Sequence, residues 1–191
     1  MSRIATTLPA WLGGAALVLW VAFEVVLRSR SGEARSFRAG GQDRGSTLLV
    51  VAAYAAALVL PWLLPRVGAL PPAARWVGVG AAFAGLALRA WSMRALGAAY
   101  TRTLRTAGGL ALVIAGPYRL IRHPGYAGSL LVWLGTAAAR GSGAALILVV
   151  LLVVGAYAWR IQVEEVMLAE RFGAEYRAYA ARTRRLIPGV Y

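Results

Sequence analysis

The sequence predicts an all-α integral membrane protein with about five transmembrane helices, including a helical hairpin in the C-terminal half, and a cytoplasmic amphipathic helix at the C-terminus. Two observations predict this class. The 191 residues are 60% hydrophobic, above the roughly 45–50% that is usual in soluble domains. Long uncharged windows also separate clusters of Arg. The net charge of +14 does not indicate nucleic acid as a partner, because nucleic-acid-binding domains carry their basic residues on one water-facing surface.

The uncharged windows cover residues 4–23, 46–65, 76–88, 124–139 and 141–159. About 20 helical residues cross a hydrocarbon core of roughly 30 Å, so the first, second and fifth windows are long enough. The third window is long enough if it begins at Pro71 and if Arg75 and Arg89 extend their guanidinium groups to the two membrane surfaces. The turn at residues 141–143 joins the last two windows into the hairpin, whose first helix crosses at a tilt or incompletely.

Residues 162–191 are expected to form the cytoplasmic amphipathic helix. Its apolar side would consist of Val163, Val166, Met167, Phe172 and Tyr176. The sequence contains no internal repeat and no low-complexity linker. We therefore expect one domain over residues 1–191, with the first three membrane helices in residues 1–96 and a cofactor-binding half in residues 97–191.

The Arg residues predict the orientation in the membrane. All 21 basic residues are Arg. Assigning them to loops leaves only four on one side of the membrane, namely Arg3, Arg66, Arg75 and Arg140. The positive-inside rule then places the N-terminus outside and the C-terminus in the cytoplasm. A chain without Lys and rich in Arg and Ala is typical of a high-GC bacterium, so we expect a bacterial cytoplasmic membrane.

The chain has only seven acidic residues, and their positions are informative. Glu24 stands four residues before Arg28, and we expect it to pair with Arg28 along the helix. Glu164 and Glu165 follow the last window, where adjacent carboxylates repel each other and are costly to desolvate. Arg160 stands one turn before Glu164 and is the expected partner. A solvated ion pair worth about 0.3–0.5 kcal/mol is the alternative interpretation.

The single histidine, His123, lies in a loop that covers residues 116–128. Pro117 and Pro124 interrupt helix on both sides of it, and a proline is favoured at the first position of the next helix. The basic side chains around that helix start are Arg119, Arg122 and His123. A helix N-terminus with such neighbours suits a carboxylate or phosphate, although an Arg-rich interface loop anchored by tyrosines explains the pattern equally. With no Cys and one His, no metal site is expected.

The run from Arg122 to Gly128 (RHPGYAG), followed by Glu164 and Glu165, resembles the cofactor-binding signature of a known family. That family is the isoprenylcysteine carboxyl methyltransferases, with the related membrane phospholipid methyltransferases. The resemblance extends to residues 116–119 (GPYR), 171–179 (RFGAEYRAY) and 186–190 (LIPGV), and it covers about the C-terminal half. The first two windows resemble the family only in being hydrophobic.

The resemblance implies a pocket for S-adenosylmethionine beneath the membrane, with S-adenosylhomocysteine as the product, and an acceptor that enters from the bilayer. The implied cofactor-binding residues are Tyr118, Arg122, His123, Pro124, Tyr126, Gly128, Glu164, Glu165, Leu186, Ile187 and Pro188. The two glutamates would hold ribose hydroxyls or the amino group, and residues 186–188 would close over the adenine. The implied catalytic residues are Arg160, Glu164 and Arg122, with Arg160 near the reacting groups.

The chemistry of methyl transfer suits such a site. Displacement at a sulfonium mainly requires that two partners be aligned and water excluded. A carboxylate acceptor needs no general base, because the reference pKa of an α-carboxyl group is about 3.5, and a cation such as Arg160 or Arg122 would orient it. A phenol or amine acceptor requires deprotonation, and then His123 or a glutamate is the candidate base.

The sequence therefore predicts a membrane O-methyltransferase that acts on the carboxylate, phenol or hydroxyl of a lipophilic small molecule or a prenylated acceptor. Membrane lipid is the other expected partner. Phospholipid amine N-methylation is an alternative, as are a non-enzymatic membrane protein and a membrane reductase related to sterol reductases. Cofactor binding separates these hypotheses, because only the methyltransferases bind S-adenosylmethionine.

Overall fold

The computed structural model describes residues 3–30, 43–63, 67–97 and 112–189. Within these ranges every regular element is a helix, which confirms the predicted all-α class. The elements are α1 (Arg3–Arg30), α2 (Ser46–Leu63), α3 (Pro72–Leu96), the short 3-10 helix η3 (Gly116–Arg119), α4 (Pro124–Arg140) and α5 (Gly143–Arg182). Two helices are long and apolar enough to cross a membrane, over Thr7–Leu27 and within Gly143–Arg182, and Ser46–Pro61 is a shorter apolar helix. The number of spans stays a prediction.

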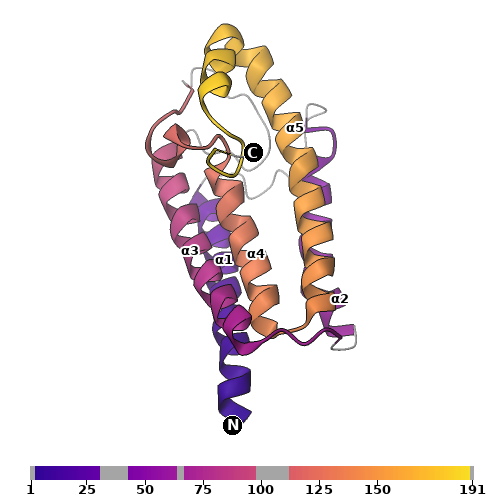
Figure 1. The fold of residues 1–191 in the computed structure, drawn as a ribbon. Helices are drawn as coiled ribbons and strands as arrows, with labels where there is room; N and C mark the ends of the chain where they lie inside the picture. Colours follow the sequence, from indigo (N-terminus) through magenta and orange to yellow (C-terminus); the bar gives the residue numbers. More distant parts are fainter. Residues whose placement is uncertain (1–2, 31–42, 64–66, 98–111, 190–191) are drawn as a thin grey trace.

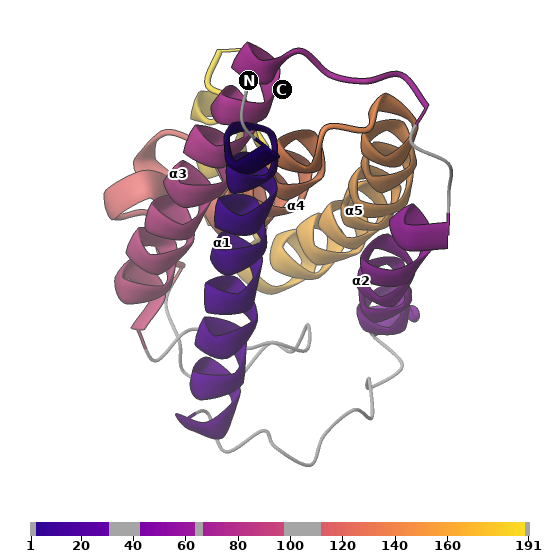
Figure 2. The same ribbon diagram turned by 90° about the horizontal axis from the view of Figure 1, so that it is seen from below.

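The helices form an elongated bundle in which α4 occupies the centre. It packs against α1, α3 and α5, while α2 packs on α5 (Figures 1 and 2). Helix α1 begins at one end of the bundle, and α3 ends, α4 begins and α5 ends toward the other (Figure 1). This arrangement brings the loop before α4 and the end of α5 to the same end of the molecule.

The outer faces of the helices are apolar. Leu48 on α2 is 73% exposed and Val77 on α3 is 71% exposed. Val18 on α1 and Leu151 on α5 are likewise exposed. Apolar surface of this extent is unfavourable in water but is the surface that a helix presents to lipid.

Glycines bring α3 and α4 into backbone contact. A Cβ atom added at Gly85 would lie 2.5 Å from the carbonyl oxygen of Gly128, and one added at Gly135 would lie 2.5 Å from that of Gly78. The two glycines on each helix stand seven residues apart, so each pair meets on one side of its helix. Close approach through small residues is a principal source of helix association in membranes, because lipid provides no hydrophobic driving force.

We expect Gly135→Leu to destabilise the bundle by about 3 kcal/mol or more, because the added side chain would overlap the α3 backbone. The matched control is Gly80→Leu, which adds the same bulk on α3 where nothing lies within 4 Å of the added Cβ atom. Thermal unfolding of the purified proteins in detergent measures both effects. Equal melting temperatures for the two variants would contradict the contact.

The buried acid of α1 has a partner that the sequence did not indicate. Glu24 Oε1 lies 2.8 Å from both Nε and Nη2 of Arg89 on α3, and both side chains are buried. The predicted extension of Arg89 to a membrane surface is therefore wrong. Its guanidinium points into the bundle because a buried carboxylate needs a cation beside it. The side chain of Arg28 lies outside the described residues.

Helix α5 differs from the predicted pair of helices. It continues through Gln162 without a break, and the first non-helical residue is Gly173, with φ 51° and ψ −119°. The reason is local, since no helix-breaking residue follows the apolar window until that glycine. At 1.5 Å per residue, the 30 residues of α5 before Gly173 span about 45 Å, about one and a half times a hydrocarbon core of roughly 30 Å. The charged second half therefore extends beyond the lipid, and its role as a cytoplasmic amphipathic helix stays a prediction.

Candidate functional site

The loop before α4 and the segment after α5 are joined through their backbones. Ile121 and Arg184 form a parallel bridge. The amide of Arg122 donates to the carbonyl of Arg184 at 2.7 Å, and the amide of His123 donates to the carbonyl of Arg185 at 3.0 Å. Segments about 60 residues apart in the chain are thus held side by side.

Glu165 lies at the centre of this junction. Its Oε1 accepts from Nε of Arg122 at 2.8 Å and lies 3.3 Å from Nε2 of His123. Its Oε2 accepts from Nε of Arg185 at 2.9 Å. Both carboxylate oxygens therefore have cationic or imidazole partners. The structure thus brings the predicted loop and the paired glutamates into direct contact.

These contacts keep Glu165 ionised. Burial by itself would raise the pKa of Glu165, but hydrogen bonds from His123, Arg185 and Arg122 outweigh burial and lower that pKa below its ordinary value. A carboxyl group with a lowered pKa stabilises the folded state above its unfolded pKa, about 4.3 for Glu, and that stabilisation is lost as the pH falls further. The cluster is therefore fully formed at neutral pH.

Arg122 also holds the end of α5. Its Nη1 donates to the carbonyl of Ala180 at 3.0 Å and to that of Thr183 at 2.5 Å. Carbonyl groups in the last turn of a helix lack partners within the helix, and a guanidinium is a favourable one. Arg122 therefore connects the loop, Glu165 and the helix end. A direct part in a reaction stays a prediction.

Two polar atoms beside this cluster are buried without a hydrogen-bond partner among the described residues. They are Oε2 of Glu164 and the hydroxyl of Tyr176. Oε2 of Glu164 lies 3.7 Å from Nδ1 of His123. Burial, followed by the charge of Glu165, raises the pKa of Tyr176, so the phenol stays neutral. Buried polar atoms without partners are rare in folded proteins, and water, an ion or a ligand usually supplies the missing hydrogen bond.

Arg160 lies on the membrane side of the cluster and contacts α2 and α4. It donates from Nε to the hydroxyl of Tyr126 at 2.7 Å and from Nη1 to Oγ1 of Thr47 at 3.0 Å. Its Nη1 also lies 3.7 Å from Oδ1 of Asp43, which is fully buried. The ring of Tyr126 stacks on that of His123, with centroids 5.6 Å apart. Arg160 is thereby linked to His123 through the side chain of Tyr126.

Asp43 and the residues after it contribute to the site, although no sequence pattern indicated that they would. Asp43 accepts from Oγ of Ser46 at 2.6 Å and from the amide of Thr47 at 3.0 Å, so it caps the start of α2. An Asp followed by Ser and Thr directly before an apolar run is a helix-start signal. That signal predicts the cap, but it does not predict the contact with Arg160.

The remaining predicted residues have defined places. The carbonyl of Tyr118 accepts from the hydroxyl of Tyr179 at 2.8 Å. Pro124 begins α4. A Cβ atom at Gly128 would lie 2.8 Å from the amide nitrogen of Arg89, so this glycine is needed for helix packing. Leu186 packs against the core, whereas Ile187 and Pro188 are exposed.

The fold and the site define a helical membrane protein whose polar centre lies where its last long helix extends beyond the lipid. The phospholipid methyltransferase family model matches residues 73–175, more than half of the chain. The chain therefore belongs to the phospholipid methyltransferase family.

The resemblance seen in the sequence is confirmed, and it extends over almost the whole chain. Two relatives named probable protein-S-isoprenylcysteine O-methyltransferase, from Oryza sativa subsp. indica and subsp. japonica, are each 28% identical over 190 residues. The alignments cover 95% of this chain and 96% of each relative. The solved structure of the eukaryotic intramembrane Ras methyltransferase ICMT matches with a TM-score of 0.67 and 17% identity, over 100% of this chain and 70% of that one. This last likeness concerns the fold.

Proposed function

We propose that this protein transfers a methyl group from S-adenosylmethionine to the carboxylate, phenol or hydroxyl of a lipophilic acceptor at the cytoplasmic face of a bacterial membrane. The observation that carries the proposal is the buried Oε2 of Glu164, which lies 3.7 Å from Nδ1 of His123 and has no hydrogen-bond partner in the described part of the chain. S-adenosylmethionine would supply a methyl group already activated on a sulfonium. Its ammonium, ribose hydroxyls and adenine amine are donors, and a buried carboxylate oxygen is the acceptor that they need.

The residues divide into two groups in this proposal. Glu164 would accept a hydrogen bond from a donor group of the cofactor, and the hydroxyl of Tyr176 would donate one to a hydrogen-bond acceptor of the cofactor. Glu165, with both oxygens already occupied by partners of the chain, would act by holding the loop and the C-terminal segment in place. The other proposed cofactor contacts are Tyr118, Arg122, His123, Pro124, Tyr126, Gly128, Leu186, Ile187 and Pro188.

Arg160 would orient the acceptor. It is a buried cation whose contacts reach both Tyr126 and the start of α2, on the side from which a lipid would enter. A carboxylate acceptor would bind this guanidinium already ionised, and the chain would only have to align it with the methyl group and exclude water. A phenol acceptor would have to lose its proton, and His123, which belongs to this cluster, would be the base that accepts that proton. The two relatives named isoprenylcysteine O-methyltransferase favour the carboxylate, because that is the oxygen nucleophile of a prenylated C-terminal cysteine.

Phospholipid amine N-methylation is the second candidate. The match of residues 73–175 to the phospholipid methyltransferase family favours it. Mild alkali identifies transfer to a carboxylate, since it cleaves a methyl ester but leaves an N-methyl group and a phenol ether intact.

The test is transfer of labelled methyl from S-adenosylmethionine into a total lipid extract by purified wild-type protein and by Glu164→Gln. Losing one charge-assisted hydrogen bond should weaken binding of S-adenosylhomocysteine about 10- to 100-fold and reduce transfer accordingly. Glu170→Gln is the matched control, because Glu170 is exposed on the same helix. Mild alkali applied to the labelled lipid then distinguishes an ester from the other products. Wild-type protein that neither binds the cofactor nor labels any lipid would refute the proposal.

A further inference from the structure

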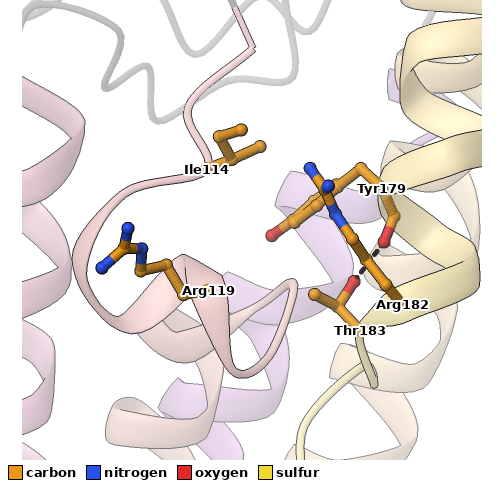
Figure 3. A pocket seen from close by; sticks show the side chains of 5 residues that line it. All are labelled: Ile114, Arg119, Tyr179, Arg182 and Thr183. Atoms are coloured by element: carbon orange, nitrogen blue, oxygen red, sulfur yellow. Dashed lines mark hydrogen bonds between the residues drawn. The ribbon is translucent and has the colours of Figure 1, made fainter.

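A cleft of about 290 Å³ lies between η3 and the last turn of α5 (Figure 3). Its lining residues are Ile114, Arg119, Tyr179, Arg182 and Thr183. None of the residues proposed above to hold the cofactor or the acceptor lines it. Arg119, although close to Arg122 and His123 in the sequence, therefore lines a different cleft.

Buried hydrogen bonds hold the walls of this cleft in place. The hydroxyl of Tyr179 donates to the carbonyl of Tyr118 at 2.8 Å, which ties α5 to η3. Oγ1 of Thr183 donates to the carbonyl of Tyr179 at 2.8 Å. Tyr179 and Thr183 are both buried. The cleft thus exists before any ligand arrives, so a ligand would bind without ordering these groups.

The charges in the cleft are all positive. Arg119 comes from η3 and Arg182 from the end of α5, on opposite sides in Figure 3. No acidic residue lines the cleft, and in the described part of the chain neither guanidinium has an acidic partner. Burial raises the pKa of Tyr179 to about 12, against the lowering effect of Arg122 and Arg182, so the phenol stays neutral. Two cations that share a hollow repel each other until an anion lies between them.

We propose that this cleft binds the phosphate of an anionic phospholipid headgroup. Guanidinium groups form paired hydrogen bonds with phosphate oxygens, and two guanidinium groups from opposite walls would grip one phosphate from two sides. A headgroup bound in the cleft would bridge Arg119 of η3 and Arg182 at the end of α5. The site is separate from methyl transfer, and it does not depend on what the acceptor is.

The apolar side chains near the cleft favour a lipid over free phosphate. Ile114 lines the cleft and is exposed. Leu120, directly after Arg119, is 59% exposed. Aliphatic side chains beside paired guanidinium groups match a molecule with a phosphate and an apolar chain, and a soluble anion would leave them in water.

The test measures binding of dihexanoylphosphatidylglycerol to the purified full-length protein in detergent, by calorimetry. Wild type is compared with Arg119→Gln/Arg182→Gln and with Arg177→Gln/Arg184→Gln. The second double variant removes the same charge from exposed side chains outside the cleft. Losing charge-assisted bonds from both walls should weaken the cleft variant about 10-fold or more. The control variant should stay within about twofold of wild type, because screened surface charges contribute little.

Inorganic phosphate and S-adenosylhomocysteine are the other two probes. The proposal expects phosphate to bind the wild type more weakly than the lipid, and it expects both double variants to bind S-adenosylhomocysteine as the wild type does. That second result also shows that the variants are folded. Equal losses in the two double variants would mean nonspecific charge attraction and would overturn the proposal. Phosphate binding as strong as lipid binding, or a parallel loss of S-adenosylhomocysteine affinity in the cleft variant, would also overturn it.

Discussion

Glu24→Ala is expected to destabilise the folded bundle by about 3–5 kcal/mol, because it removes the carboxylate that pairs with the buried charge of Arg89. The Glu24 and Arg89 side chains are only 6% and 8% exposed, and their closest atoms are 2.8 Å apart. In a bundle surrounded by lipid the freed guanidinium cannot easily reach water, so its desolvation is not compensated. Thermal unfolding in detergent, followed by tryptophan fluorescence, measures the loss.

The double variant Glu24→Leu/Arg89→Met shows whether Glu24→Ala is unstable because of the buried charge of Arg89 or because of lost packing. Removing both partners leaves no unpaired charge, and replacement of a buried ion pair by apolar side chains is often neutral or stabilising. We therefore expect the double variant to recover most of the stability that Glu24→Ala loses. A double variant as unstable as Glu24→Ala would show that packing, and not charge, makes the position sensitive.

The fold class was predictable because hydropathy is a local property of the sequence. The windows, the start of α3 near Pro71 and the turn between α4 and α5 all follow from composition over short stretches. Which helix contacts which was not predictable in the same way. The pair of Glu24 with Arg89 joins residues 65 apart in the chain, and nothing in the spacing of either segment indicates the other.

The contact between the loop and the paired glutamates was expected from the sequence, but the different contacts of Glu164 and Glu165 were not. Neighbouring residues on a helix point about 100° apart. Glu165 therefore faces Arg122 and Arg185, while Glu164 faces His123 with an oxygen that accepts no hydrogen bond from the described residues. In the sequence the two glutamates form one motif. Their contacts differ only because the C-terminal segment folds back onto one side of the helix.

Glu165→Ala is expected to release the C-terminal segment and to abolish methyl transfer. The substitution leaves Arg122, His123 and Arg185 close together with no anion between them, and repulsion among them then opposes the bridge between residues 121 and 184. Removing one member of a buried charge network costs about 3–5 kcal/mol. Most of that cost would fall on this junction, because the hydrogen bonds lost with Glu165 join the loop before α4 to the C-terminal segment.

Limited digestion with trypsin, followed by mass spectrometry, measures the release directly, because Arg184 and Arg185 are cleavage sites inside the junction. Cleavage there requires the segment to leave the loop, so its rate should rise about tenfold or more in Glu165→Ala. Glu175→Ala is the matched control, since Glu175 is an exposed acid on the same helix, and its digestion should follow the wild type. The cleavage rate of Glu165→Gln should fall between those of the wild type and Glu165→Ala. The amide oxygen still accepts one hydrogen bond, while the amide nitrogen faces cations that are also donors. If the tail stays equally protected in all four proteins while methyl transfer is lost only in the two Glu165 variants, Glu165 acts on the bound cofactor directly, and its positioning role is wrong.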